Sequence, residues 1–368
     1  MNAVLKYLTF IGVLAAASYA AATLDVSSVL PAGAKKEKSS GGAVPIPSLS
    51  RKPAHLLSGL QGQAVVDYSA AKNLTAAAAA DTLKIWQLPN EKAQLDFDTG
   101  DDFQVLALKF IPAKGLLAAG GRTIEGSAGG VRLFDMTSGK LILQIDEPEP
   151  VMSLDLHPGG DYLLATARTY LKVIAVKDGA AVALLPKESP TSRGYFYGGG
   201  STVLLSDSLA LFDVNTQKKT GDLDTVPPLL VRKIGNSSRF VWLTPDGLAS
   251  RGAPNALREF VPLPTKGVVA FDVEPNGRWG LLLLEDRKLV TFDAASGKIT
   301  RTVSLASSAT DVSINPDAAS AAVALASGEI AVYDIGGRNA VNTVRFQMTN
   351  ALHAAGEKLS LLFERVTR

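Results

Sequence analysis

A short segment that recurs along the chain restricts the fold more than any other feature of the sequence. "VRLFDMTSGKLILQI" at 131–145 contains an apolar run ending in Phe-Asp, a polar turn with glycine, and a second apolar run. Related segments begin at residues 83, 171, 209, 289 and 330, and a degraded copy lies at 247–261. A period near 40 residues with several short strands per unit is typical of a β-propeller, a ring of four-stranded blades.

One unit shows how the four strands follow one another. "GVVAFDVEP" (267–275) alternates in polarity, "GRWGLLLLED" (277–286) is a buried run, and "KLVTFDAAS" and "KITRTVSL" complete the set, with turn residues between them. Helical periodicity is nowhere sustained, so we predict an all-β chain. The repeated segment is then the third strand, the turn and the outermost fourth strand of a blade. Its Phe should pack against the neighbouring blade, and its Asp should accept backbone N–H groups of the turn.

The ends of these third strands also carry a family resemblance. "LFD", "TFD" and "VYD", which follow segments such as "HPGGDYLLAT" and "EPNGRWGLLL", resemble the WD40 and YVTN-type propeller families over about 64–346. The Gly-His dipeptide that opens a typical WD40 repeat is absent, so the His–Ser/Thr–Asp–Trp network of that family is not expected here. Apolar packing between adjacent sheets should hold the blades together instead.

The number of blades depends on how the two ends are used. Residues 64–346 hold seven units, while 347–368 resembles the first two strands of a unit and 43–60 resembles a fourth strand. The sequence therefore favours eight blades, with the ring closed by N- and C-terminal strands in one sheet, which removes free strand edges. Seven blades is the alternative, because Pro45 and Pro47 interrupt a regular strand.

The N-terminal residues predict export. "MNAVLKYLTFIGVLAAASYAAA" (1–22) has the basic start, apolar run and small residues of a signal peptide, and its apolar stretch is short for a bilayer span. An uncleaved anchor is the alternative and would be the chain's one membrane contact. Residues 23–53, rich in Gly, Ser, Pro and Lys, are predicted to be a flexible linker, followed by the propeller at 54–368. We expect a periplasmic or cell-envelope location.

Residue composition excludes several kinds of site. The chain has no cysteine and three histidines, and it shows no nucleophile elbow, P-loop, EF-hand or His-pair spacing. A formal net charge of +2 gives no reason to expect nucleic acid. We therefore predict a non-catalytic propeller without cofactor or metal, acting as a protein-interaction scaffold or envelope assembly factor. The rival is a ligand-binding or enzymatic propeller, as among quinoprotein and lactonase propellers, using Arg168, Glu285 and Arg287 at the channel mouth.

Charge patterning suggests where a partner binds. Loops joining a fourth strand to the next blade should share a face with loops joining second and third strands, and that face should be acidic. The predicted partner-binding carboxylates come from "DFDTGDD" and "DEPEP", namely Asp98, Asp101, Asp102, Glu147 and Glu149. They favour a basic protein partner, with ordinary solvated turns or a calcium site as alternatives. The insertion at 122–130 should extend a loop on the same face.

Overall fold

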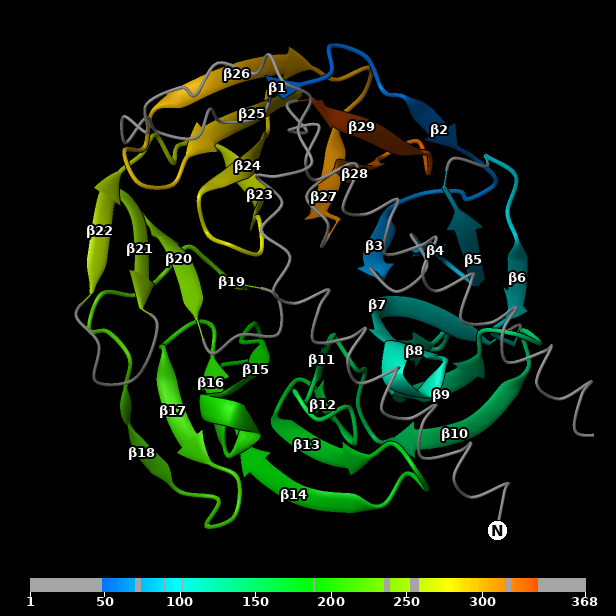
Figure 1. Cartoon of the computed structure of the whole chain (residues 1–368). Helices are drawn as coiled ribbons and strands as arrows, with labels where there is room; N and C mark the ends of the chain where they lie inside the picture. The colour runs from blue at the N-terminus through cyan, green and yellow to red at the C-terminus, as the bar shows by residue number, and fades with distance from the viewer. Residues whose placement is uncertain are drawn as a thin grey trace, which may run out of the picture. The chain divides into compact units, whose positions relative to one another are not determined.

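The computed structural model describes residues 48–69, 74–88, 91–100, 102–187, 189–234, 239–251, 258–315 and 319–336. These residues form seven antiparallel sheets arranged as blades around a common axis (Figure 1). The predicted signal peptide at 1–22 and the C-terminal segment at 347–368 lie outside the described residues. Within the described ranges, no helix has the length and hydrophobicity needed to cross a bilayer.

Each of the first four blades consists of four consecutive strands. Blade 1 contains β3 (Ala64–Ser69), β4 (Leu74–Ala79), β5 (Thr82–Gln87) and β6 (Leu95–Asp98). Blade 2 contains β7 (Phe103–Ile111), β8 (Leu116–Thr123), β9 (Gly129–Asp135) and β10 (Leu141–Glu147), with a 3-10 turn, η2, at Pro112–Lys114. Blade 3 contains β11 (Ser153–Leu156), β12 (Tyr162–Thr166), β13 (Tyr170–Ala175) and β14 (Ala181–Pro186). Blade 4 contains β15 (Gly194–Tyr197), η3 (Gly198–Gly200), β16 (Thr202–Leu205), β17 (Ala210–Asp213) and β18 (Lys219–Asp222).

The last blade takes its outermost strands from the other end of the chain. Blade 5 contains β19 (Leu230–Lys233), β20 (Phe240–Thr244), β21 (Gly247–Arg251) and β22 (Glu259–Pro262). Blade 6 contains β23 (Val268–Val273), β24 (Trp279–Leu284), β25 (Lys288–Asp293) and β26 (Ile299–Ser304). Blade 7 contains β27 (Ala309–Ile314), β28 (Ser320–Leu325) and β29 (Ile330–Gly336), and β2 (His55–Leu57) and β1 (Ser48–Leu49) both pair with β29.

This pairing corrects the expectation of eight blades. The N-terminal segment does supply a fourth strand, but it joins the blade of β29 rather than a blade completed by 347–368. Blade 7 lies directly beside blade 1, where the hydroxyl of Thr310 donates to the carbonyl of Ala64 over 3.2 Å. No place is left between these blades, so the described ring closes at seven. Strand β1 lies inside the segment assigned to the linker, and the ring therefore includes Ser48.

Apolar packing between blades is confirmed as the main contact. Seven clusters of buried side chains lie one at each interface between neighbouring blades of the described ring. Phe134, at the end of the opening repeat, is fully buried and meets Phe97 of blade 1 edge-to-face at 5.3 Å. Phe292 of blade 6 is also fully buried and lies in one cluster with apolar side chains of blade 5. Where a blade carries the aromatic residue of the repeat, that residue thus joins the blade to the preceding one.

The aspartate of the repeat has the predicted local role. Oδ1 of Asp135 accepts the backbone N–H groups of Thr137 and Ser138, at 3.0 and 2.7 Å. Asp213 and Asp293 make the equivalent bonds in their own turns. Hydrogen bonds from Ser138, first from its hydroxyl, lower the pKa of Asp135. These carboxylates therefore fix the turn between the third and fourth strands and are occupied there.

The loops that join a fourth strand to the next blade share one face with the loops that join second and third strands, as predicted. Backbone bonds join them in blades 2, 3 and 6: Ile124 N–H donates to the carbonyl of Asp102, Lys187 to Thr169, and Glu285 to Gly267. We call this the loop face, and the opposite side, which holds the turns between third and fourth strands, the turn face. The insertion ends on the loop face, where residues 124–128 join β8 to β9.

Substitutions in β2 test the closure. Leu57 is fully buried between blades 7 and 1, whereas its neighbour Leu56 is 42% exposed. Leu57→Ala should lower the free energy of unfolding by about 2–5 kcal/mol, because it removes core contacts from the strand that completes blade 7. Leu56→Ala should change it by less than about 0.5 kcal/mol. Urea unfolding of both variants is the measurement, and equal effects would contradict closure through β2.

Candidate functional site in the central channel

The innermost strand of every blade places one side chain at the same depth in the channel. These seven residues share a register, since each pairs with a residue of the second strand nine positions later in the sequence. They all line a cavity of about 710 Å3 that opens towards the turn face. We call them the lower tier: Asp67, Lys109, Asp155, Tyr195, Arg232, Asp272 and Ser313.

Three aspartates of the lower tier connect neighbouring blades. Oδ2 of Asp67 accepts the backbone N–H of Phe110 in blade 2 over 2.9 Å. Asp155 bonds Phe196 in blade 4 over 2.8 Å, and Asp272 bonds Ile314 in blade 7 over 2.7 Å. In each case the acceptor belongs to one innermost strand and the donor to the next. Because a buried N–H group left without an acceptor is costly, these carboxylates stabilise the order of the blades.

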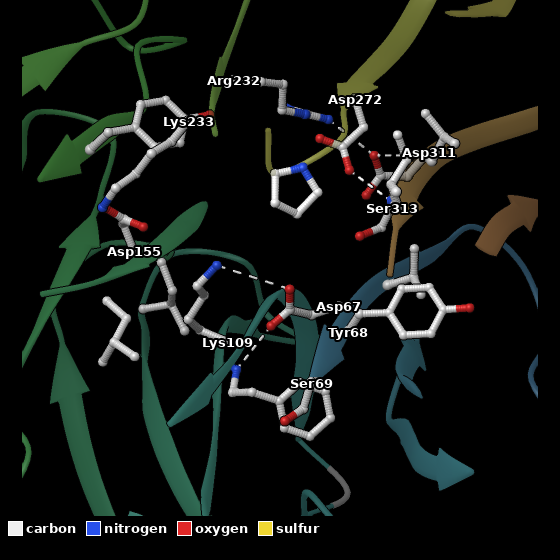
Figure 2. A pocket seen from close by; sticks show the side chains of 18 of the residues that line it. Asp67, Tyr68, Ser69, Lys109, Asp155, Arg232, Lys233, Asp272, Asp311 and Ser313 are labelled. Atoms are coloured by element: carbon white, nitrogen blue, oxygen red, sulfur yellow. Dashed lines mark hydrogen bonds and ion pairs between the residues drawn. The ribbon is translucent and has the colours of Figure 1, made fainter. Parts of the chain in front are cut away.

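Ion pairs extend the network to blades that are not neighbours. Lys233 of blade 5 donates to Asp155 of blade 3 over 3.0 Å, and both side chains are less than a tenth exposed. Arg232 donates to Asp311 of blade 7 over 3.2 Å and to the carbonyl of Phe271 over 2.9 Å. Figure 2 shows Arg232, Asp272 and Asp311 side by side, with Lys233 and Asp155 grouped separately. The charged side chains in the channel thus also connect blades that are not adjacent in the ring.

Four lower-tier groups have shifted pKa values, among them Lys109 and Asp272. The carboxylate of Asp67 raises the pKa of Lys109, whose Nζ lies 3.9 Å from it. Burial raises the pKa of Asp272 to about 6, against the opposing effect of Arg232. Asp272 therefore changes charge near pH 6 at a position that faces the cavity. Among the residues that the structure describes, no group of His, Asp or Glu has the arrangement of a metal site.

A second set of seven residues lies nearer the loop face. Each lies two residues before its lower-tier counterpart, within an innermost strand or, for Arg193, directly before β15. All seven line a cavity of about 620 Å3 that opens on the loop face. We call them the upper tier: Val65, Ala107, Ser153, Arg193, Leu230, Ala270 and Asp311. The two cavities share Arg193, Tyr195, Arg232 and Asp311. The tiers therefore form the wall of one channel.

Apolar side chains surround the loop-face opening. Bulges in β7, β23 and β27 insert Leu106, Val269 and Thr310 at the level of the opening. Met152 and Leu229 line it from loops between blades, and Met152, Leu229 and Val269 are 43%, 52% and 37% exposed. We call Leu106, Met152, Leu229 and Val269 the apolar collar. Bulges are frequent where a strand redirects a side chain towards a functional site.

The carboxylates predicted from "DFDTGDD" are partly exposed on the loop face. Asp98 and Asp102 are solvent-exposed, although Asp98 accepts the N–H of Gly100 and Asp102 lies 3.5 Å from Arg132. Asp101 lies outside the described residues.

The carboxylates predicted from "DEPEP" are less available. Glu147 is 3% exposed, and it accepts hydrogen bonds from Lys172 at 2.6 Å and from the hydroxyl of Tyr170 at 2.6 Å. The expectation that it faces a partner is therefore corrected, because it is the last residue of β10 and is covered by β13. Glu149 holds the N–H and hydroxyl of Thr169, and the hydroxyl bond is the main cause of its lowered pKa.

The residues predicted at the channel mouth lie elsewhere on the loop face. Arg168, Glu285 and Arg287 are exposed in loops between second and third strands. None of the three lines either channel cavity, so the structure does not bring them together there.

Sequence reasoning missed the channel residues, although a signal was present. Polar residues interrupt the innermost strands two positions before the residue that precedes proline, as in "LKFIP", "LDLHP" and "FDVEP". Aligning these segments with "VVDYS" would have placed Lys109, Asp155, Asp272 and Asp67 at one depth. In a closed ring, side chains at one depth of the innermost strands face a common axis.

Comparison with known proteins supports the class of fold. No protein-family model matches the sequence, and no curated protein matches it. Among solved structures, the chain is similar to the β-propeller domain of Cps50 (Swd1) from Myceliophteria thermophila. The TM-score is 0.66 with 14% sequence identity, covering 77% of this chain and 99% of that one. The protein is therefore a β-propeller with a WD40-like fold.

Because the pKa of Asp272 is raised, the free energy of unfolding should depend on pH in a direction that can be predicted. The native state binds the proton of Asp272 more tightly than the unfolded state, in which the pKa of this carboxyl is near 3.8. Asp272 should thus make the free energy of unfolding fall as pH rises from about 4 to about 6. Asp272→Asn should remove that part of the slope, while Ser313→Ala in the same tier should retain it. Urea unfolding across this pH range measures both, and an unchanged slope in Asp272→Asn would contradict the assignment.

Proposed function

We propose that the protein is an exported, non-catalytic interaction scaffold that binds a protein partner through its loop face. A β-propeller fold is commonly a protein-interaction scaffold. The observation that carries the proposal is the apolar collar around the loop-face cavity. Exposed apolar side chains gathered at an opening and bordered by polar loops are typical of an interaction site.

The charges inside the channel support a structural use of its lower tier. Asp67, Asp155 and Asp272 hold backbone N–H groups of the next blade, while Lys233 and Arg232 are paired with carboxylates. Groups committed in this way stabilise the ring and are poorly placed to exchange partners with a substrate. This leaves the loop-face opening as the part of the channel best suited to recognition.

Export enters the proposal from the N-terminal sequence. A basic start, an apolar run and small residues at 1–22 support a signal peptide, and the absence of cysteine suits an oxidising compartment. A periplasmic or cell-envelope scaffold, including an envelope assembly factor, follows from this reasoning.

Site-specific photo-crosslinking in the native envelope tests the proposal. A photoreactive phenylalanine analogue at Leu229, in the apolar collar, should crosslink to a defined partner protein. The same analogue at Ile299, which is 37% exposed on the outermost strand of blade 6, is the matched control and should give no such product. A partner captured equally at both positions, or at Ile299 alone, would place the interface outside the loop face.

The exposed carboxylates of the β6–β7 loop suggest a basic surface on that partner. Replacing Asp98 and Asp102 with asparagine should slow association several-fold at low salt and much less at high salt, because exposed charges are screened beyond about 8–10 Å. The melting temperature should stay nearly unchanged. Stopped-flow association with the captured partner is the measurement. If the variant and the original protein have the same on-rate at low salt, these carboxylates are ordinary solvated turn residues with no part in binding.

A second candidate is a ligand-binding or enzymatic propeller that uses the lower-tier cavity. The observation in its favour is Asp272, whose burial raises its pKa to about 6 beside Arg232 in a cavity of about 710 Å3. A small molecule that stays bound to the natively purified protein in mass spectrometry, and is lost in Asp272→Asn, would support this candidate over the scaffold.

A further inference from the structure

We propose that the loop-face cavity binds the free C-terminal carboxylate of a partner protein whose last residues are apolar, with Arg193 and Ser153 as the recognition pair. This inference rests on the proposed function and specifies the chemistry of the partner. It follows from two hydrogen-bonding groups of the upper tier that the described structure leaves unused.

Among the described residues that line the two cavities, Arg193 is the cation without a carboxylate partner. Asp67, Asp155 and Asp311 each have a cationic partner, and Lys109, Lys233 and Arg232 each have a carboxylate. Among the described residues, no side chain forms an ion pair or a hydrogen bond with the guanidinium of Arg193, although Arg193 lines both cavities. Arginine can bind a carboxylate through two parallel N–H donors, which no lysine can imitate.

Ser153 supplies a second donor at the same depth. Its hydroxyl is buried, with 9% of the residue exposed, and it has no hydrogen-bond partner among the described residues. Ser153 and Arg193 hold the same upper-tier position in blades 3 and 4, which are neighbours, and both line the loop-face cavity. A buried hydroxyl without a partner is costly. The hydroxyl oxygen of Ser153 has almost no accessible surface, so the side chain would rotate towards the cavity to bind a ligand oxygen, and that bond would remove the cost. Arginine and serine donors together match a carboxylate.

Competing carboxylates are held away from this pair. Asp311, the other charged upper-tier residue, lies in blade 7, three blades from Arg193 in the ring, and it is paired with Arg232. Asp207 also lines the cavity, but it accepts a hydrogen bond from Ser192 and forms no ion pair with Arg193. Lys187, which lies nearby in the chain, directs its ammonium group to the carbonyls of Ala167, Pro190 and Ser192.

The surroundings favour a chain end over a folded element or a free ion. The cavity of about 620 Å3 is within the range of small-ligand sites, so it admits a few residues. The apolar collar would contact the side chains that immediately precede the carboxylate. A C-terminus combines a carboxylate with adjacent apolar side chains in one extended segment, which matches a donor pair beneath an apolar opening.

Peptide pools with randomised last residues test the inference on the full-length protein. Peptides with free C-termini that end in apolar residues should be enriched at least about ten-fold over the same pool with amidated C-termini, because the amide loses the charge-assisted bonds. Arg193→Gln should abolish the enrichment and Arg193→Lys should restore little of it. Ser153→Ala should weaken it. Arg168→Gln is the control, because it removes an exposed arginine of the loop face that lies outside the cavity, and the enrichment should stay unchanged.

Several results would overturn the inference. Equal capture of acid and amide pools, no enrichment, or enrichment retained in Arg193→Gln would each exclude recognition of a C-terminal carboxylate. Octanoate that displaces the enriched peptides at matched concentration would identify a small carboxylic acid as the occupant. If Leu229 still crosslinks to a partner while the pools fail, the scaffold function stands and the C-terminal inference falls. If Leu229 crosslinks to no protein, the scaffold itself fails.

Discussion

The pairing of β2 with β29 is the interaction on which the rest of the ring depends. Without β2, blade 7 would end in the unpaired edge of β29, and the cluster around Leu57 and Ile330 would lose its outer wall. Blade 7 carries Asp311 and Ser313 into the channel, and it meets blade 1 at Thr310. Both tiers are therefore complete only when the two ends of the propeller share one sheet. Closure creates the channel as well as the stability of its wall.

Once the ring is closed, the two tiers of its wall have different uses. In the lower tier, three aspartates accept N–H groups from the next blade, and paired lysine and arginine side chains balance their charge. The upper tier contains mostly small or apolar residues and makes few polar contacts. Ser153 and Arg193 are therefore available at a level where the fold does not require them. The residues that stabilise the ring and those proposed for recognition thus lie two positions apart along the chain in each blade, on the same side of the innermost strand.

Much of the fold could be predicted from the sequence because the repeat is local. The third strand, turn and fourth strand of each unit follow one another, and Asp135 acts within three residues of its own position. The blade count depended instead on which distant strand the segment at Leu57 would join, and no local pattern specifies that choice. Glu147 was misplaced for a similar reason, since an acidic run resembles a loop until Lys172 and Tyr170 of the next blade cover it. The channel residues required all seven innermost strands to be aligned at once.

The balance of charge in the channel explains why an unpaired arginine could confer specificity. Arg193 is exposed, so in the free protein water solvates its charge and little stability is lost. A chain end that entered past the apolar collar would displace that water, and the guanidinium would then need a carboxylate to offset the lost hydration. A neutral amide would leave the charge poorly solvated, and a basic residue would add repulsion. The cavity would therefore discriminate mainly by penalising the wrong occupants, while the collar contributes affinity that depends little on the identity of the apolar side chain.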